Sequence, residues 1–221
     1  MISAKGISKA FRKNLILNNI DLTAPSGKAA VIVGKNGAGK STLLSILAGY
    51  LKPDAGSVDT GGRTVAFCPH GDDLFEELTV RDNILFWQHA RGADSNQNTL
   101  NLTQLLEVDT YQQKRVGHLS AGMKKTVALV CALAGNPTVL ILDEPFTGLD
   151  IFYKNALLKA FEVLLAQDIC IVYTSHAADE IVGVNSDVYT LSGGCLSYAG
   201  TSESLKEKGS DMMEHLLSKL A

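Results

Sequence analysis

The sequence has few of the features that mark secreted, membrane-spanning or nucleic-acid-binding proteins. Its only cysteines, Cys68, Cys131, Cys170 and Cys195, show no spacing typical of metal ligands or redox pairs. No apolar run approaches the roughly 18 residues of a transmembrane helix, and the N-terminal stretch does not resemble a signal peptide. Lys and Arg form no dense run, and the net charge is −3. We therefore expect buried thiols in a reducing cytoplasm and no nucleic-acid partner.

Aromatic residues (6%) and proline (5 residues) are also scarce, but hydrophobic residues make up 46% of the chain and charged residues only 19%. This composition provides ample material for a core. A length of 221 residues suits one large domain or a core with one inserted lobe. We expect a single domain over residues 1–221, in which a helical region of about residues 72–135 interrupts an α/β core.

The most specific pattern lies at residues 34–41, which fit Gly, four residues, then Gly-Lys-Ser. The apolar run 29–33 before it indicates a buried strand, and apolar residues recur at helical spacing after it. This order is the context of a phosphate-binding loop, in which the Lys40 ammonium reaches the outer phosphates and the Ser41 hydroxyl helps to coordinate Mg²⁺. The residues expected to bind the nucleotide here are Gly34, Lys35, Asn36, Gly37, Ala38, Gly39, Lys40, Ser41 and Thr42.

Polar residues also follow two other apolar runs, which are predicted to be strands of a parallel sheet. The run 138–142 ends in Asp143 and Glu144, and the run 169–173 is followed by His176. Ligands bind beyond the carboxyl ends of such strands. We expect Asp143 to hold Mg²⁺, Glu144 to deprotonate a water from the opposite face of the strand, and His176 to bond to the γ-phosphate or to Glu144.

Taken together, these motifs resemble the nucleotide-binding subunits of ABC (ATP-binding cassette) transporters over nearly the whole chain. Residues 34–41 match the Walker A motif, residues 139–144 the Walker B motif with its catalytic glutamate, and residues 148–150 the D-loop. His176 matches the switch histidine, and residues 119–123 stand at the place of the signature motif. The resemblance implies a P-loop NTPase core of class α/β with a mostly parallel sheet, an N-terminal antiparallel β subdomain and an inserted α-helical subdomain.

The resemblance also implies roles for single residues. Phe11 stands where the family has the aromatic residue that stacks on adenine, although its local sequence fits an edge-strand core position equally well. Ser120 and Gly122 would cap the γ-phosphate held by a second subunit, either another copy of the chain or a homologous ATPase. Catalysis would rest on Glu144, with His176 and Lys40. The expected activity is Mg²⁺-dependent ATP hydrolysis that drives a separate transmembrane permease from the cytoplasmic face of the cell membrane.

Two departures from the family pattern bear on this expectation. His70 stands where the Q-loop glutamine would fall, and Ala121 and Met123 replace Gly and Gln in the signature. These departures leave open the alternative that the chain is a cassette that binds ATP without hydrolysing it. A second alternative is a non-transport ABC ATPase that acts as a conformational switch on another macromolecule. Residues 75–83 resemble compact exporter-type cassettes, and the chain ends soon after its last predicted strand, so export is the expected direction.

Overall fold

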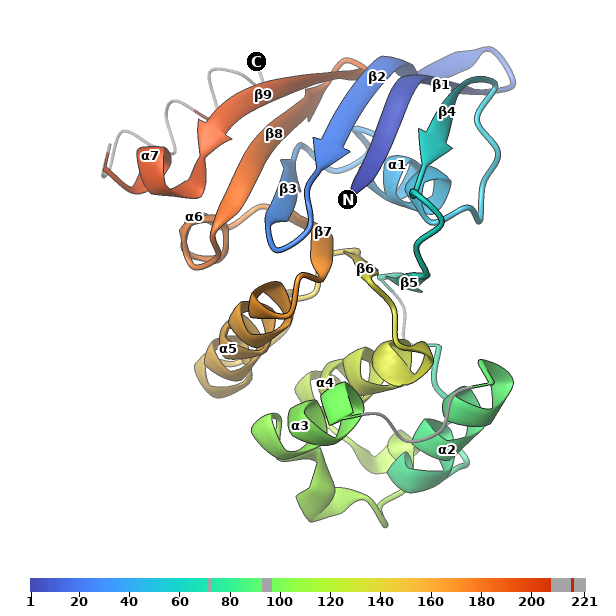
Figure 1. The fold of residues 1–221 in the computed structure, drawn as a ribbon, viewed down its shortest axis with the longest axis vertical. Coiled ribbons are helices and arrows are strands. Elements are labelled where there is room, and N and C mark those ends of the chain that lie inside the picture. The colour runs from blue at the N-terminus through green and yellow to red at the C-terminus, as the bar shows by residue number, and fades with distance from the viewer. Residues whose placement is uncertain (71–72, 93–96, 208–215, 217–221) are drawn as a thin grey trace.

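The computed structural model describes residues 1–70, 73–92, 97–207 and 216, which form two β-sheets and a set of helices (Figure 1). The strands are β1 (Ile2–Phe11), β2 (Asn14–Ala24), β3 (Ala29–Val33), β4 (Ala55–Asp59), β5 (Val65–Cys68), β6 (Val139–Leu142), β7 (Cys170–Ser175), β8 (Ser186–Ser192) and β9 (Cys195–Thr201). The α-helices are α1 (Lys40–Leu47), α2 (Val80–Ala90), α3 (Gln97–Leu105), α4 (Ala121–Ala132), α5 (Ile151–Ala166), α6 (Ala178–Val182) and α7 (Ser202–Lys206). Short 3₁₀ turns lie at Val108–Tyr111, Val116–His118 and Leu133–Gly135.

The larger sheet has the strand order β5-β6-β7-β3-β8-β9, and only β9 runs antiparallel to its neighbour. Every residue of β3, β6 and β7 is buried because both faces of this sheet are covered. On one face Ile32 packs in a cluster with Leu43 of α1 and with the smaller sheet, and on the other face Val31 packs in a cluster with Phe161 of α5. The carboxyl ends of five parallel strands therefore share one edge.

The smaller sheet is antiparallel, with the order β2-β1-β4. Helices α2, α3 and α4 lie together on the side of the molecule away from this sheet, beneath β5 and β6 in Figure 1. Helix α2 starts where the sequence predicts, because the hydroxyl of Thr79 accepts a hydrogen bond from the Asp82 N–H (3.1 Å). The molecule thus combines a mostly parallel sheet, a small antiparallel sheet and a helical region, as the sequence indicates.

Several element predictions need correction. Strand β1 continues to Phe11, so of the two placements that the sequence leaves open for this residue, the structure shows the edge strand, with the residue 48% exposed. Pro53 and Gly56 indicate a turn at residues 52–57, but strand β4 begins at Ala55 and pairs through Asp59 with Ser3 of β1. Its sequence, Ala-Gly-Ser-Val-Asp, has little β propensity, so this long-range pairing and not the local sequence determines its structure. The sequence after Gln97 predicts a short helix over residues 100–108, whereas α3 begins at Gln97 and ends at Leu105. The helix predicted at residues 211–220 lies outside the described residues.

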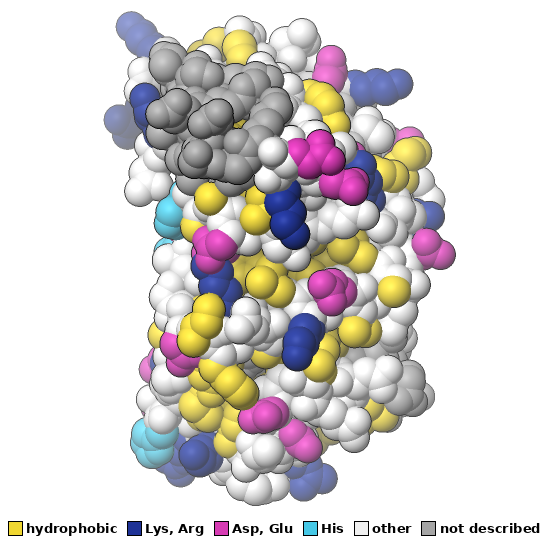
Figure 2. Space-filling model, turned by 90° about the vertical axis from the view of Figure 1, so that its left-hand side faces the viewer, with side chains coloured by type: hydrophobic (Ala, Val, Ile, Leu, Met, Phe, Trp, Pro, Cys, Tyr) yellow, Lys and Arg dark blue, Asp and Glu magenta, His cyan; other side chains and the backbone are white. Residues whose placement is uncertain are grey.

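The surface mixes charges with apolar side chains. On the face shown in Figure 2, Lys and Arg side chains alternate with Asp and Glu, and hydrophobic side chains lie between them in an interrupted band. Cys131, Cys170 and Cys195 are free thiols, and burial raises the pKa of Cys131 and Cys170. Cys195, expected to be buried, is exposed on β9. Within the described part of the chain, no helix combines the length and apolar character needed to cross a bilayer.

Candidate nucleotide-binding site

A cavity of about 450 Å³ opens at the carboxyl edge of the parallel sheet, and we call it the cleft. It gathers residues that are up to 133 positions apart in the chain, from 11 to 144. Its lining residues are Phe11, Ile16, Asn36, Gly37, Gly39, Lys40, Ser41, Thr42, His70, Asp143 and Glu144. Most of the residues predicted to bind a nucleotide or metal ion therefore lie in one place. Ile16 was not predicted, because nothing in its local sequence distinguishes it from other strand residues.

The glycine loop is shaped by conformations that other residues rarely adopt. Gly37 and Gly39 have φ values of +82° and +103°. A Cβ on Gly39 would lie 2.8 Å from the Ile16 side chain, and one on Gly34 would lie 2.7 Å from the Leu191 carbonyl oxygen. Gly39 is also the N-cap of α1 and offers no side chain to the first N–H groups of the helix. These N–H groups and the helix dipole are suited to bind an anion at the cleft.

The Lys40 side chain lies at the floor of the cleft with only 6% of its surface exposed. Its ammonium donates hydrogen bonds to the carbonyl oxygens of Gly34 (2.9 Å) and Lys35 (3.2 Å). The same nitrogen lies 3.9 Å from a carboxylate oxygen of Glu144. A buried positive charge thus connects the glycine loop with the acidic end of β6.

Asp143 and Glu144 both line the cleft, so the prediction that they face opposite sides of the strand is wrong. Strand β6 ends at Leu142, and Glu144 has a left-handed φ of +50°, which ends the side-chain alternation of a strand. Thr174 of β7 holds this turn, because its hydroxyl donates to the Asp143 carboxylate (2.7 Å) and accepts from the Glu144 N–H (2.7 Å). The buried Asp143 and the Glu144 side chain therefore act in the same space.

Three further groups surround the Glu144 carboxylate. The Nδ1 atoms of His70 and His176 lie 3.8 Å and 4.0 Å from its two oxygens, and the Thr147 hydroxyl donates to it at 3.2 Å. His176 contacts the glutamate without lining the cleft itself. The sequence predicted the proximity of His176 but gave no signal for Thr147 or Thr174, because both are brought near by the fold and belong to no motif.

The predicted signature residues lie elsewhere. Ser120 is exposed at the start of α4, where its hydroxyl accepts the Met123 N–H (3.3 Å), and neither Ser120 nor Gly122 lines the cleft. Gly122 is buried against α5, and a Cβ there would lie 2.9 Å from the ring of Tyr153. Gly122 therefore has a packing role between the two helices, which the sequence did not predict.

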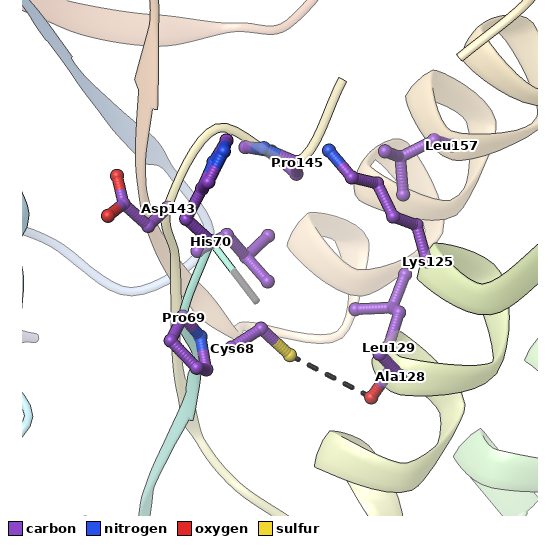
Figure 3. Close-up of a pocket in the computed structure, with 10 residues that line it drawn as sticks. Cys68, Pro69, His70, Lys125, Ala128, Leu129, Asp143, Pro145 and Leu157 are labelled. Atoms are coloured by element: carbon purple, nitrogen blue, oxygen red, sulfur yellow. Dashed lines mark hydrogen bonds between the residues drawn. The ribbon is translucent and has the colours of Figure 1, made fainter. Parts of the chain in front are cut away.

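A second, smaller cavity lies behind the acidic turn, between β5, the residues after β6, and helices α4 and α5 (Figure 3). It is largely apolar, with His70, Lys125 and Asp143 as its polar members. The Cys68 thiol donates to the Ala128 carbonyl oxygen (3.7 Å) across it. The cavity lies between helix α4 and the turn that follows β6, so contacts that cross it connect the helical region with that turn.

Comparison with known proteins assigns this arrangement to a family. The family model described as "ABC transporter" matches residues 17–147, which is more than half of the chain. The chain belongs to the ABC transporter family. The match begins directly after Ile16, includes the glycine loop and both acids, and ends at Thr147, so it covers most of the residues that line the cleft.

Individual relatives share about a third of the sequence. The Nod factor export ATP-binding protein I of Rhizobium sp. (strain N33) is 34% identical over 81% of this chain and 64% of its own length. The Fe(3+) ions import ATP-binding protein of Pectobacterium atrosepticum is 31% identical over 91% of this chain and 63% of its own length. The chain therefore spans less than two thirds of the length of these relatives. A solved structure of the ATP-binding subunit of an ABC transporter covers 99% of this chain and 98% of its own, with a TM-score of 0.86 and 24% identity. The predicted fold class is confirmed.

An ion-pair cluster supports the backbone next to His176. The ammonium of Lys154 on α5 lies 2.6 Å from the Asp179 carboxylate and 3.0 Å from that of Glu180, which is buried. Glu180 in turn accepts a hydrogen bond from the Ser175 hydroxyl (2.6 Å), one residue before His176. The cluster thus connects α5 to the end of β7.

We expect the replacement of Lys154 by Met to lower the free energy of unfolding by about 2–3 kcal/mol, because it leaves the buried Glu180 carboxylate without its cation. This value lies between those typical of exposed and of buried ion pairs. Burial opposes the charged form, but the hydrogen bonds to Asp179 and Glu180 outweigh it and raise the pKa of Lys154 above 10.5. The hydrogen bond from Lys154 lowers the pKa of Asp179 below 3.8. Urea unfolding of the variant and of Lys159→Met, an exposed control on α5, measures the loss.

The directions of these two pKa shifts determine how the stabilisation by the ion-pair cluster depends on pH. The depressed pKa of Asp179 stabilises the fold above about pH 4, and this contribution is lost as the pH falls through that pKa. The raised pKa of Lys154 stabilises it below about pH 10.5, and this contribution is lost as the pH rises further. The difference between wild type and Lys154→Met should be constant between these limits and shrink outside them. A difference that is unchanged at pH 3 would contradict the ion-pair account.

Proposed function

We propose that the chain binds Mg²⁺-ATP in the cleft and hydrolyses it as the ATPase subunit of a transporter. The observation that carries this proposal is the position of the Glu144 carboxylate, which lies at the cleft beside Lys40, His70 and His176. Asp143 and Ser41 supply the oxygen ligands that Mg²⁺ prefers, and both line the cleft. When bound, Mg²⁺ would neutralise charge on the β- and γ-phosphate oxygens.

Different residues of the chain would bind the phosphates, bind the base and activate the attacking water. The N–H groups of the glycine loop and the Lys40 ammonium hold the phosphates, and the exposed ring of Phe11 at the rim of the cleft stacks on the base. Glu144 accepts a proton from the attacking water, a role that typically contributes 10²–10⁴-fold to the rate. Thr147 and His176 orient its carboxylate.

The position of the signature residues supports a two-subunit site. Ser120 is exposed at the N-terminus of α4 and lies outside the cleft, although an N-terminus of this kind attracts anions. We propose that it binds the γ-phosphate of ATP held by a second copy or a homologous subunit, and that residues 72–135 act as the subdomain that carries it. Each ATP would then be enclosed by both partners in an isologous dimer.

A groove between the core and the helical region suits a membrane partner. Tyr50, which is 75% exposed, packs against Phe67 at one side of it, and Trp87 of α2 lies under the Arg91 guanidinium at the other. The Trp87 indole N–H is buried without a hydrogen-bond partner in the described structure. Clustered aromatic residues such as the exposed Tyr50 are typical of a docking site. We propose that a transmembrane permease docks here, which would place the chain at the cytoplasmic face of the membrane.

The direction of transport is proposed from one segment of the chain. The relatives include an export protein and an import protein at similar identity, so overall similarity does not distinguish the two. The exporter-like segment 75–83 places Phe75 against Phe86 and Trp87 of α2, next to the groove. We propose export because residues 75–83 resemble the corresponding segment of compact exporter-type cassettes.

Purification of the chain from native membranes tests the transporter proposal. We expect an integral membrane protein to be recovered with the wild-type chain. Tyr50→Asp should reduce this recovery at least about tenfold, because a charge among the aromatic side chains of a docking site is poorly tolerated. Leu100→Asp, an exposed apolar position on α3 outside the groove, should not. Recovery of ribosomes in place of a membrane protein would contradict the proposal and favour a non-transport ATPase.

A further inference from the structure

One side chain of the helical region reaches the backbone of the catalytic turn. The ammonium of Lys125 on α4 donates hydrogen bonds to the carbonyl oxygens of Glu144 (2.9 Å) and Thr147 (2.5 Å). Figure 3 shows the Lys125 side chain extending from α4 past the small cavity toward Pro145, which lies in the chain between Glu144 and Thr147. The contact is partly buried, and both acceptors are backbone atoms.

The turn that Lys125 holds needs such support. Glu144 has a left-handed backbone conformation (φ +50°), which residues other than glycine seldom adopt unless the surrounding structure enforces it. Its N–H is fixed by the Thr174 hydroxyl, and its carboxylate accepts from the Thr147 hydroxyl. Lys125 fixes the carbonyl oxygens at both ends, so that the position of Thr147, and through it that of the carboxylate, depends on α4.

We propose that Lys125 is a positioning residue that sets the Glu144 carboxylate according to the position of helix α4. The same helix begins at Ser120, which by the proposed function contacts the ATP of the partner subunit. Binding of that second ATP would therefore adjust the hydrolytic glutamate of this subunit through Lys125. The consequence for the second ATP rests on the proposed function, whereas the contact itself rests on the two hydrogen bonds of Lys125.

The neighbouring lysine provides a matched control. Lys124, one residue earlier on α4, pairs with the exposed carboxylate of Glu76 at 2.5 Å. It has the same chemistry, and its partner lies in the segment before α2 and not in the catalytic turn. Replacement by Met preserves the length of either side chain and removes its donors.

Steady-state ATP hydrolysis by the full chain tests the role. We expect Lys125→Met to lower kcat about tenfold with KM changed by less than about twofold, because the general base is misplaced while the phosphate loop is intact. Lys125→Arg should restore kcat to within about threefold, since it keeps a cation that donates to both carbonyls. Lys124→Met should behave as wild type. An unchanged kcat in Lys125→Met, or a loss that appears only in KM, would overturn the proposal.

Amide hydrogen exchange provides a readout that needs no hydrolysis. Without nucleotide, residues 143–150 should exchange at least about fivefold faster in Lys125→Met than in wild type or Lys124→Met, because the turn opens more often. Equal exchange in all three would overturn the proposal. If wild type hydrolyses no ATP but the exchange difference is present, the proposed function fails and the positioning contact stands. Should Lys125→Met not fold, Lys125→Gln, which retains a shorter neutral donor, takes its place with the same two criteria.

Discussion

Replacing Glu144 by Gln is expected to lower the rate of ATP hydrolysis about 1000-fold while ATP affinity changes less than about threefold. The amide keeps the size of the side chain and its hydrogen bond from Thr147, but it cannot accept a proton from water. The phosphate contacts made by the glycine loop and Lys40 are untouched, so binding should persist. The loss therefore appears in kcat.

Phosphate release and equilibrium ATP binding, measured on the same preparations, separate these effects. Glu162→Gln on α5 provides the control, because it makes the same chemical change at an exposed glutamate that does not line the cleft. It should match wild type in both measurements. If Glu144→Gln hydrolyses ATP at the wild-type rate, Glu144 is not the base and the proposed mechanism is wrong.

The second large effect concerns the subunit interface. Introducing Ser120→Asp into the Glu144→Gln chain is expected to weaken ATP-driven dimerisation at least about 100-fold, because like charges brought together across an interface cost several kcal/mol. Aspartate caps a helix as well as serine does, so α4 itself should keep its N-terminus. The variant thus separates the charge at this position from the capping bond to Met123.

Light scattering with saturating Mg²⁺-ATP measures the effect. The Glu144→Gln parent should form a dimer, Ser120→Asp in that background should stay monomeric with one ATP bound per chain, and Ser120→Thr, which retains a capping hydroxyl, should still dimerise. Dimerisation that is equally strong in the Ser120→Asp variant would show that this end of α4 does not face the partner's phosphate.

The sequence predicts the parts of the site that local patterns encode. The glycine loop, the buried run before it and the helix after it were identified because their spacing is set by backbone geometry within about twenty residues. Strands β3, β6 and β7 were identified because a strand buried on both faces is apolar at every position. Because the carboxyl ends of parallel strands share one edge of a sheet, these elements also predict that Lys40, Asp143 and Glu144 meet at one cleft.

What the sequence could not predict depends on contacts between distant segments. The turn that brings Glu144 to the same side as Asp143 is held by Thr174 and Lys125, which lie 30 and 19 residues away. No rule of strand alternation applies once the backbone leaves the β region. The packing of Gly122 against Tyr153 likewise arises between two helices. These tertiary contacts determine how the motif residues are oriented.

The most direct test of the central claim is phosphate release by the purified wild-type chain supplied with ATP, with and without Mg²⁺. The account predicts a release rate that saturates with ATP, falls to background when the metal is chelated, and disappears in Glu144→Gln. ATP that binds in the cleft and is recovered unhydrolysed after incubation with Mg²⁺, both in the isolated chain and in membranes that contain its partner, would contradict it. That result would mean that the cassette binds the nucleotide without turning it over.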